Sequence, residues 1–291
     1  MTSAPLARPH FGERVAAALD AHGPLCLGID PHARILADWG LPDSAEGALE
    51  LGLRAVDAAA GAVAIVKPQV AFFERHGGRG ILALEAVIAR ARAAGLIVIA
   101  DAKRGDIGST VDGYAEAWLA SGAALEADAL TVVAYQGTGS LAPAVDRALA
   151  AGKGLFVLAA TSNPEARRIQ SADAGGRSVA GVILDDVEAL NRAVVLGDGA
   201  PGPFGVVVGA TIDPSAFGLD LGAATATTIL APGFGEQGAR PEELRARYGA
   251  AADRVIANVA RAALQAGPEG IGAAVAELAE RFRRAREGRP T

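Results

Sequence analysis

The sequence has 291 residues, a length that suits one large α/β barrel or two ordinary domains. Its net charge of −6 argues against an extended nucleic-acid-binding surface, and its single cysteine excludes a disulfide within the chain. No apolar run reaches the roughly 18 uncharged residues of a membrane span, and the polar N-terminus does not resemble a signal peptide, so we expect a cytoplasmic protein.

After a polar start, a short amphipathic helix is expected at Phe11–Ala21. Eight apolar segments with polar or glycine-rich ends follow and are predicted as strands: Leu25–Asp30, Val63–Gln69, Leu96–Asp101, Ala129–Ala134, Leu155–Thr161, Phe204–Ala210, Thr227–Gly233 and Arg254–Ala260. Helical patterns separate or follow them: Ser44–Ala60, Ile81–Ala94, Val111–Ala120, Leu141–Ala151, Val179–Val195, Pro241–Ala251 and Pro268–Glu287. The link Thr211–Ala226 is weak as a helix, and the longest irregular stretch is Arg167–Ser178.

Strands that alternate with helices predict an α/β fold with a parallel sheet and right-handed crossovers. Closure into a single (β/α)₈ TIM barrel is the economical solution for eight strands, and a doubly wound open sheet is the alternative. Without a linker or a repeat in the sequence, we expect one domain over residues 1–291, with an N-terminal helical extension at about 1–24.

The most informative stretch is Leu96–Asp106, where a buried apolar strand runs directly into Asp101, Lys103 and Asp106. Because strand side chains alternate, Asp101 and Lys103 should point the same way, while Asp106 lies beyond them in a loop that Gly105 makes flexible. A solvated loop is the ordinary interpretation of such charges.

Lysine usage favours a role in proton transfer instead of a solvated loop. The sequence has only three lysines, Lys67, Lys103 and Lys153, and otherwise uses arginine as its cation. Two of them lie in or just after predicted strands, and a lysine can transfer a proton where an arginine cannot.

Other predicted strand ends carry polar groups, and in a barrel these ends build the active site. The stretch Pro232–Gly238 after the seventh strand is glycine-rich, and Arg261 follows the eighth strand. Glycines let backbone N–H groups approach a phosphate, and an arginine binds one bidentately, so we predict an anion site there. A plain turn into the next helix is the alternative.

Several chemistries lack support in the sequence. Metal-binding motifs and a Walker loop are absent from the sequence, so we expect the protein to use neither a metal nor a cofactor. Ser162 has no neighbouring histidine to activate it, and His32 is expected in a solvated turn. Cys26 lies within an apolar run and is expected to be a buried, inert thiol.

The combined motifs resemble those of the orotidine 5′-phosphate decarboxylase family, from about Leu25 to Arg261. The most specific part is a lysine on the second strand followed by DxKxxD after the third: Lys67, Asp101, Lys103 and Asp106. The Gly28–Pro31, Thr161–Pro164 and Pro232–Gly238 stretches match as well, and the TSNP form of the second is similar to a variant type of some bacteria. The departures are Val133–Gly137, where an Asn-Pro-Tyr-like stretch is expected, and Ala260, where serine is common.

The resemblance implies a role for each charged residue. Asp30 and Lys67 would hold the ribose hydroxyls of a small nucleotide substrate. Asp101 would lie against the departing carboxylate, and Lys103 would protonate the C6 carbanion that remains. Asp106, together with Thr110, would reach into the site of a neighbouring subunit, which implies a homodimer.

The resemblance also implies the remaining contacts. Ser162 and Asn163 would face the pyrimidine. The phosphate would be bound by Gln237, by Arg261 and by the backbone of Gly233–Gly235, and the loop after Pro232 would close over it as a lid.

Two rival functions stay open at this point. One is a sugar-phosphate lyase or decarboxylase of the same superfamily, which shares DxKxxD but uses a divalent metal with a carboxylate near the second strand, where this chain has Lys67. The other is a non-catalytic phosphate- or nucleotide-binding barrel, which would bury four charged groups at a cost in stability.

Overall fold

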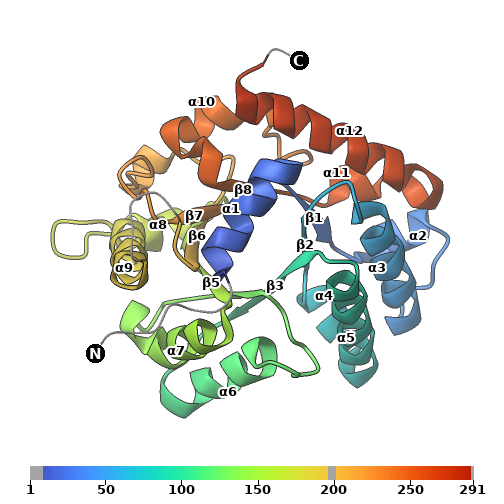
Figure 1. Cartoon of the computed structure of the whole chain (residues 1–291), viewed down its shortest axis with the longest axis horizontal. Coiled ribbons are helices and arrows are strands. Elements are labelled where there is room, and N and C mark those ends of the chain that lie inside the picture. Colours follow the sequence, from blue (N-terminus) through green and yellow to red (C-terminus); the bar gives the residue numbers. More distant parts are fainter. Residues whose placement is uncertain (1–8, 196–200, 290–291) are drawn as a thin grey trace.

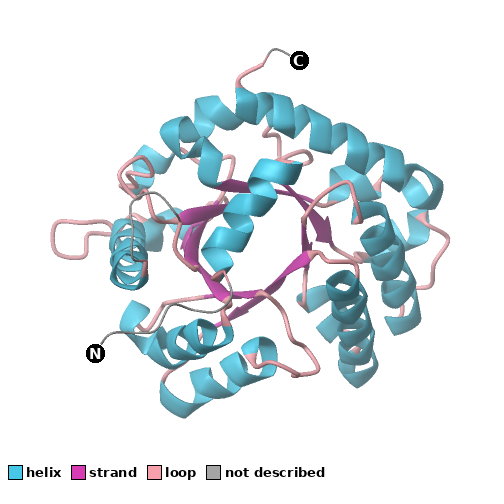
Figure 2. Ribbon diagram, viewed as in Figure 1, coloured by secondary structure: helices cyan, strands magenta, loops and turns pink. Residues whose placement is uncertain are grey.

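The computed structural model describes residues 9–195 and 201–289 as a barrel of parallel strands surrounded by helices (Figures 1 and 2). The strands are β1 Leu25–Ile29, β2 Ile65–Pro68, β3 Ile97–Arg104, β4 Ala129–Val132, β5 Gly154–Ala160, β6 Phe204–Val208, β7 Thr228–Pro232 and β8 Val255–Val259. They follow one another around the barrel in chain order, and β1 pairs in parallel with β8, with Leu25 opposite Ala257. This closure confirms the (β/α)₈ barrel and makes the open-sheet alternative wrong.

The helices cover the outside of the barrel, apart from α1. They are α1 Phe11–His22, α2 Ala33–Asp38, α3 Ala45–Ala59, α4 Ala71–Glu74, α5 Gly77–Ala93, α6 Gly108–Leu119, α7 Ala142–Ala151, α8 Ala166–Gln170, α9 Val179–Val194, α10 Leu244–Tyr248, α11 Arg261–Leu264 and α12 Gly267–Glu287. None of the helices in the described ranges is long and apolar enough to cross a membrane.

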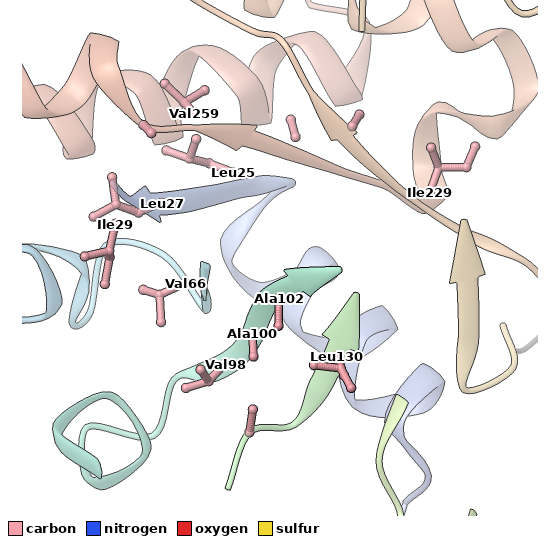
Figure 3. Close-up of a cluster of buried hydrophobic side chains, with 14 of the residues drawn as sticks. Leu25, Leu27, Ile29, Val66, Val98, Ala100, Ala102, Leu130, Ile229 and Val259 are labelled. Carbon is pink, nitrogen blue, oxygen red and sulfur yellow. The ribbon is translucent and has the colours of Figure 1, made fainter. Parts of the chain in front are cut away.

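Strand side chains alternate between two cores. Those that face outward, such as Leu27 and Val66, pack beneath the helices (Figure 3). Their neighbours Cys26 and Ile65 point into the barrel and form a second buried cluster there. Since the alternation continues toward the strand ends, Lys67 points into the barrel interior. Polar groups occupy the layer of the interior at the C-terminal ends of the strands.

Helix α1 closes the N-terminal end of the barrel, which it crosses in Figures 1 and 2. Phe11 packs edge to face on Phe156 with ring centroids 5.9 Å apart, and Arg14 donates to Asp128 at 2.7 Å. A Cβ on Gly154 would stand 2.2 Å from the Phe11 ring, which explains the glycine at this contact. The opposite, C-terminal end of the barrel is left for a site. Of the extension expected at about 1–24, residues 1–8 lie outside the described part of the chain.

Three sequence predictions need correction. The stretch Arg167–Ser178, expected to be irregular, begins within the short helix α8 Ala166–Gln170. The helix expected at Pro241–Ala251 is instead a 3₁₀ turn at Pro241–Glu243, the short α10 and a second 3₁₀ segment at Gly249–Arg254; Gly249, with φ of 52°, ends α10. Strand β3 extends beyond its expected end at Asp101, because its last residues pair across a register shift with β4. The weak link Thr211–Ala226 forms only the 3₁₀ turn Pro214–Phe217, as expected.

Candidate active site

A cavity of about 260 Å³ opens at the C-terminal end of the barrel. All eight strands or the loops after them contribute to its wall. Eight residues predicted from the sequence line it: Asp30, Lys67, Asp101, Lys103, Ser162, Gly233, Gln237 and Arg261. The closed barrel therefore gathers side chains that are up to 231 positions apart, from Asp30 to Arg261.

The carboxylate of Asp101 lies at the centre of the charged groups. Its Oδ2 accepts a hydrogen bond from Lys67 Nζ at 2.7 Å, and its Oδ1 accepts from Lys103 Nζ at 2.5 Å and from the Thr131 hydroxyl at 3.0 Å. Burial alone would raise the pKa of Asp101, but the two ammonium groups hold it far below its usual value. Asp101 is thus a permanent anion between two cations.

Lys67 is the buried member of this group, with 3% of its surface exposed. Burial by itself would lower its pKa, but the carboxylates of Asp101 and Asp30 outweigh burial and raise the pKa to about 12. Asp30 is less well satisfied, because its buried Oδ1 has no hydrogen-bond partner among the described residues and burial raises its pKa despite the nearby Lys67. A ligand hydroxyl at this point would supply the missing donor.

Lys103 has an unusual backbone. Among the non-glycine residues that the structure describes, it is the one with positive φ, at 49°. A residue held in this region costs about 1–3 kcal/mol, and such strain is concentrated at functional sites. Its side chain is 43% exposed and reaches into the cavity from the rim. Gly105 lies in close contact with the residue after β4, because a Cβ on it would stand 2.4 Å from the Val133 carbonyl oxygen. Tight packing rather than flexibility explains this glycine.

The anion site predicted after β7 is a compact turn. Gly233 and Gly235 have φ of 117° and 83°, and Gly235 N donates to Ala239 O at 2.8 Å. Gly233 and Gln237 line the cavity, whereas Gly235 holds the turn from outside it. Arg261, half-exposed at the start of α11, lines the cavity beside this turn. Among the described residues its ion pair is a long one, 3.7 Å from Glu236. Its guanidinium therefore remains available to an anion.

Besides Gly235, three predicted residues do not line the cavity of the single chain. Asn163 is exposed, with its amide oxygen accepting from the Thr161 hydroxyl at 2.8 Å and its nitrogen donating to Glu165 at 3.0 Å. Asp106 accepts from the backbone N–H of Ile107 at 2.8 Å, and Thr110 is exposed in the first turn of α6. Asp106 is half-buried and Thr110 exposed, and their role in a neighbouring subunit stays a prediction.

Sequence reasoning missed several polar residues of the wall. Gln69, with its amide nitrogen toward Asp101, donates to the carboxylate at 2.6 Å. Thr131 on β4 and Asn258 on β8 also line the cavity. The signal was present, because each is a polar residue in an apolar strand segment, and Gln69 stands two positions after Lys67 on the same face of the strand.

A second cavity of about 470 Å³ adjoins the first and shares Asp30, Gln69, Glu236 and Arg261 with it. His32 lies on its wall, where its ring caps α2 by accepting from Arg34 N at 3.3 Å. Cys26 is buried below the first cavity as predicted, and burial raises its pKa to about 12, which keeps the thiol protonated. Within residues 9–195 and 201–289, no three acidic, histidine or cysteine side chains are grouped as metal ligands.

Comparison with known proteins gives a consistent result. The sequence model described as "Orotidine 5'-phosphate decarboxylase / HUMPS family" matches residues 23–275. An orotidine 5′-phosphate decarboxylase of Streptomyces coelicolor is 50% identical over 261 residues, which cover 89% of this chain and 91% of that protein. One from Corynebacterium efficiens is 48% identical over 276 residues, covering 94% and 96%. A crystal structure assigned as this enzyme from Streptomyces avermitilis has a TM-score of 0.90 at 46% identity, with 99% of both chains covered.

Proposed function

Because the chain belongs to the orotidine 5′-phosphate decarboxylase / HUMPS family, we propose that it is a carboxy-lyase that converts orotidine 5′-phosphate to uridine 5′-monophosphate in de novo pyrimidine biosynthesis. The observation that carries this proposal is the Asp101 carboxylate, held between the ammonium groups of Lys67 and Lys103 at the base of an open cavity. Relatives at 48–50% identity with this printed name support the choice of substrate.

Each part of the substrate has matching groups in the cavity. Its phosphate binds between Arg261, Gln237 and the backbone at Gly233, where an available guanidinium meets a glycine turn. The ribose hydroxyls reach Asp30 and Lys67, and one of them satisfies the unpartnered Asp30 oxygen. The pyrimidine then lies over Asp101 and Lys103, near Ser162, with Asn163 reaching it only after the loop after β5 moves.

The reaction needs stabilisation of a localised negative charge. The bond between C6 and the carboxylate carbon breaks, CO₂ leaves, and the electron pair stays on C6 in an orbital that the ring π system cannot delocalise. The Lys103 ammonium lies where this charge develops, gives its proton to C6 and recovers one from solvent. At about 4 Å and an effective dielectric constant of about 20, one such charge contributes roughly 4 kcal/mol.

Asp101 has two tasks in this mechanism. Its charge orients the ammonium groups of Lys67 and Lys103, so that little reorganisation is needed when the carbanion forms. It also repels the substrate carboxylate and favours its departure. Binding of the distant phosphate stabilises the closed loop after Pro232, and this binding energy lowers the barrier at C6.

The active form is a homodimer in which Asp106 and Thr110 complete the neighbouring site. Exposed apolar side chains in the segments that follow β3 and β4 support this arrangement: Ile107 is 60% exposed, and Tyr135 has 85% of its surface exposed. Such side chains are suited to burial against a second copy of the chain. We further propose that residues 1–291 act as one domain in the cytoplasm, with no cofactor, nucleic acid or membrane partner.

The rival function is that of a metal-dependent sugar-phosphate lyase or decarboxylase, and Lys67 argues against it here. A divalent metal held near β2 would stand beside this buried ammonium group, whose pKa of about 12 keeps it charged. The test is to supply the purified protein with orotidine 5′-phosphate and, separately, with a phosphorylated keto sugar plus Mg²⁺. We expect absorbance loss and CO₂ release with the nucleotide alone; turnover of the sugar phosphate alone would contradict the proposal.

A further inference from the structure

A neutral side chain, that of Thr131, joins the two charged residues at the end of β3. Thr131 lies on β4, is buried with 1% of its surface exposed, and lines the cavity. Its hydroxyl accepts a hydrogen bond from the backbone N–H of Lys103 at 2.9 Å and donates one to Asp101 Oδ1 at 3.0 Å. Both partners belong to the end of β3 that carries the proposed chemistry.

These bonds form part of a closed ring. Lys103 N–H donates to the Thr131 hydroxyl, the hydroxyl donates to Asp101 Oδ1, and the same oxygen accepts from Lys103 Nζ at 2.5 Å. The main chain and the ammonium group of Lys103 are therefore tied to the same side chain. A shift of the Lys103 backbone would move both ends of the residue.

The strand pairing shows why a side chain is needed here. Ala100 pairs with Leu130 and Arg104 with Val132, so three residues of β3 lie opposite the single residue Thr131. This bulge interrupts the regular ladder and coincides with the positive φ of Lys103. The Thr131 hydroxyl takes the place of a backbone acceptor for the Lys103 N–H, which would otherwise lack a partner in the bulge.

We propose that Thr131 is a positioning residue, whose hydroxyl holds the strained Lys103 backbone and the Asp101 carboxylate in the arrangement that protonates C6. The inference rests on the proposed function. It assigns Thr131 no contact with the reacting atoms, and it places its effect on the chemical step rather than on binding of the phosphate, which takes place across the cavity at Arg261.

The experiment compares three variants that differ little in shape. Thr131→Val removes the hydroxyl at nearly constant volume, and Thr131→Ser retains it. Thr228→Val is the matched control, because Thr228 on β7 is also buried, at 3% exposure, but it does not line the cavity and its hydroxyl has no hydrogen-bond partner in the part of the chain that the structure describes. For each variant, kcat and KM for orotidine 5′-phosphate and the thermal unfolding midpoint are measured.

We expect Thr131→Val to lower kcat about 10- to 100-fold with KM changed less than about threefold, since small displacements of a catalytic group have effects of this size. Thr131→Ser and Thr228→Val should stay within about threefold of the wild type in kcat. A Thr131→Val enzyme with a lower unfolding midpoint but wild-type kcat would overturn the proposal, because the hydroxyl would then serve stability alone. If Thr131→Val does not fold, Thr131→Ala takes its place in the same comparison.

A second measurement does not depend on activity. Amide hydrogen exchange of Lys103, followed by NMR on the unliganded protein, should be slow in the wild type and in Thr131→Ser, and at least about tenfold faster in Thr131→Val. Equal exchange in all three would overturn the proposed hold on the Lys103 backbone. A wild type without decarboxylase activity but with this exchange pattern would contradict the proposed function and leave the positioning of Lys103 by Thr131 intact.

Discussion

Lys67 and Lys153 are both buried, at 3% and 5% exposure, yet they lie at opposite ends of the barrel. The Nζ atom of each is 2.7 Å from a carboxylate, that of Asp101 for Lys67 and that of Glu126 for Lys153. Lys67 lines the cavity at the end of β2, whereas Lys153 stands directly before β5, at the N-terminal end. By pairing distance alone the two lysines are indistinguishable.

Their surroundings differ in how completely charge and hydrogen bonds are satisfied. Lys153 Nζ also donates to Ala127 O at 2.6 Å, and Arg92 pairs with the same Glu126 at 2.8 Å. Burial lowers the pKa of Lys153 although Glu126 opposes it, whereas at Lys67 two carboxylates outweigh burial. The buried oxygen of Asp30 stays without a partner beside Lys67.

The comparison teaches that a buried lysine–carboxylate pair does not by itself indicate a site. The pair at Lys153 is a closed structural unit. The group around Lys67 has strained backbone, an unsatisfied acceptor and several charges that face a cavity, all of which cost stability unless a ligand uses them. The following predictions test this distinction in order of expected effect.

The largest effect is expected at the cavity end, from Lys103. Lys103→Arg should lose more than about 1,000-fold in kcat, nearly as much as Lys103→Ala, because arginine keeps the charge but is a poor acid and too bulky for the position. Steady-state kinetics with orotidine 5′-phosphate measures this. Turnover of Lys103→Arg within tenfold of the wild type would contradict the role of proton donor.

Arg261→Ala should give the next largest effect. Loss of a charge-assisted contact should reduce kcat/KM for orotidine 5′-phosphate by about 100- to 1,000-fold, equivalent to about 3–4 kcal/mol. The nucleoside orotidine, which lacks the phosphate, serves as the control and should be turned over at nearly the wild-type rate. Equal losses on both substrates would show that Arg261 supports the fold rather than the phosphate.

Lys153→Met tests the closed pair. The variant leaves Glu126 with Arg92 and the Gly122 N–H as partners. We expect the free energy of unfolding to fall by about 2–4 kcal/mol while kcat at 25 °C stays within about twofold of the wild type. Lys67→Met is the matched variant and should lose activity instead. Both variants are compared by denaturant unfolding and steady-state kinetics. A large loss of kcat in folded Lys153→Met would contradict the distinction between the structural pair at Lys153 and the functional group around Lys67.

The smallest expected effect is the activity that returns when two inactive variants exchange subunits, which tests whether Asp106 acts in the neighbouring subunit. The inactive variants Lys103→Ala and Asp106→Ala are mixed and allowed to exchange subunits. Half of the dimers are then mixed, and each has one fully intact site, so about a quarter of wild-type activity should return. If mass measurement verifies exchange and activity does not return, Asp106 does not act in the neighbouring site.

Much of the fold was predictable because alternating apolar strands and helices leave few arrangements for eight parallel strands. Asp101 and Lys103 were predictable for the same reason, since period two places both at one strand tip. The bulge opposite Thr131 was not, because it depends on the register between β3 and β4, which local sequence does not encode. The break in Pro241–Ala251 and the outward amide of Asn163 likewise depend on loop conformations set by tertiary contacts.

The central claim is that the ammonium group at Lys103 drives decarboxylation without a metal. Its most direct test follows the absorbance of orotidine 5′-phosphate with wild-type protein treated exhaustively with EDTA, beside folded Lys103→Ala in the same buffer. We predict that EDTA leaves the wild-type kcat unchanged and that Lys103→Ala shows no measurable turnover. Loss of wild-type turnover that Mg²⁺ restores, or turnover of Lys103→Ala within tenfold of the wild type, would contradict the claim.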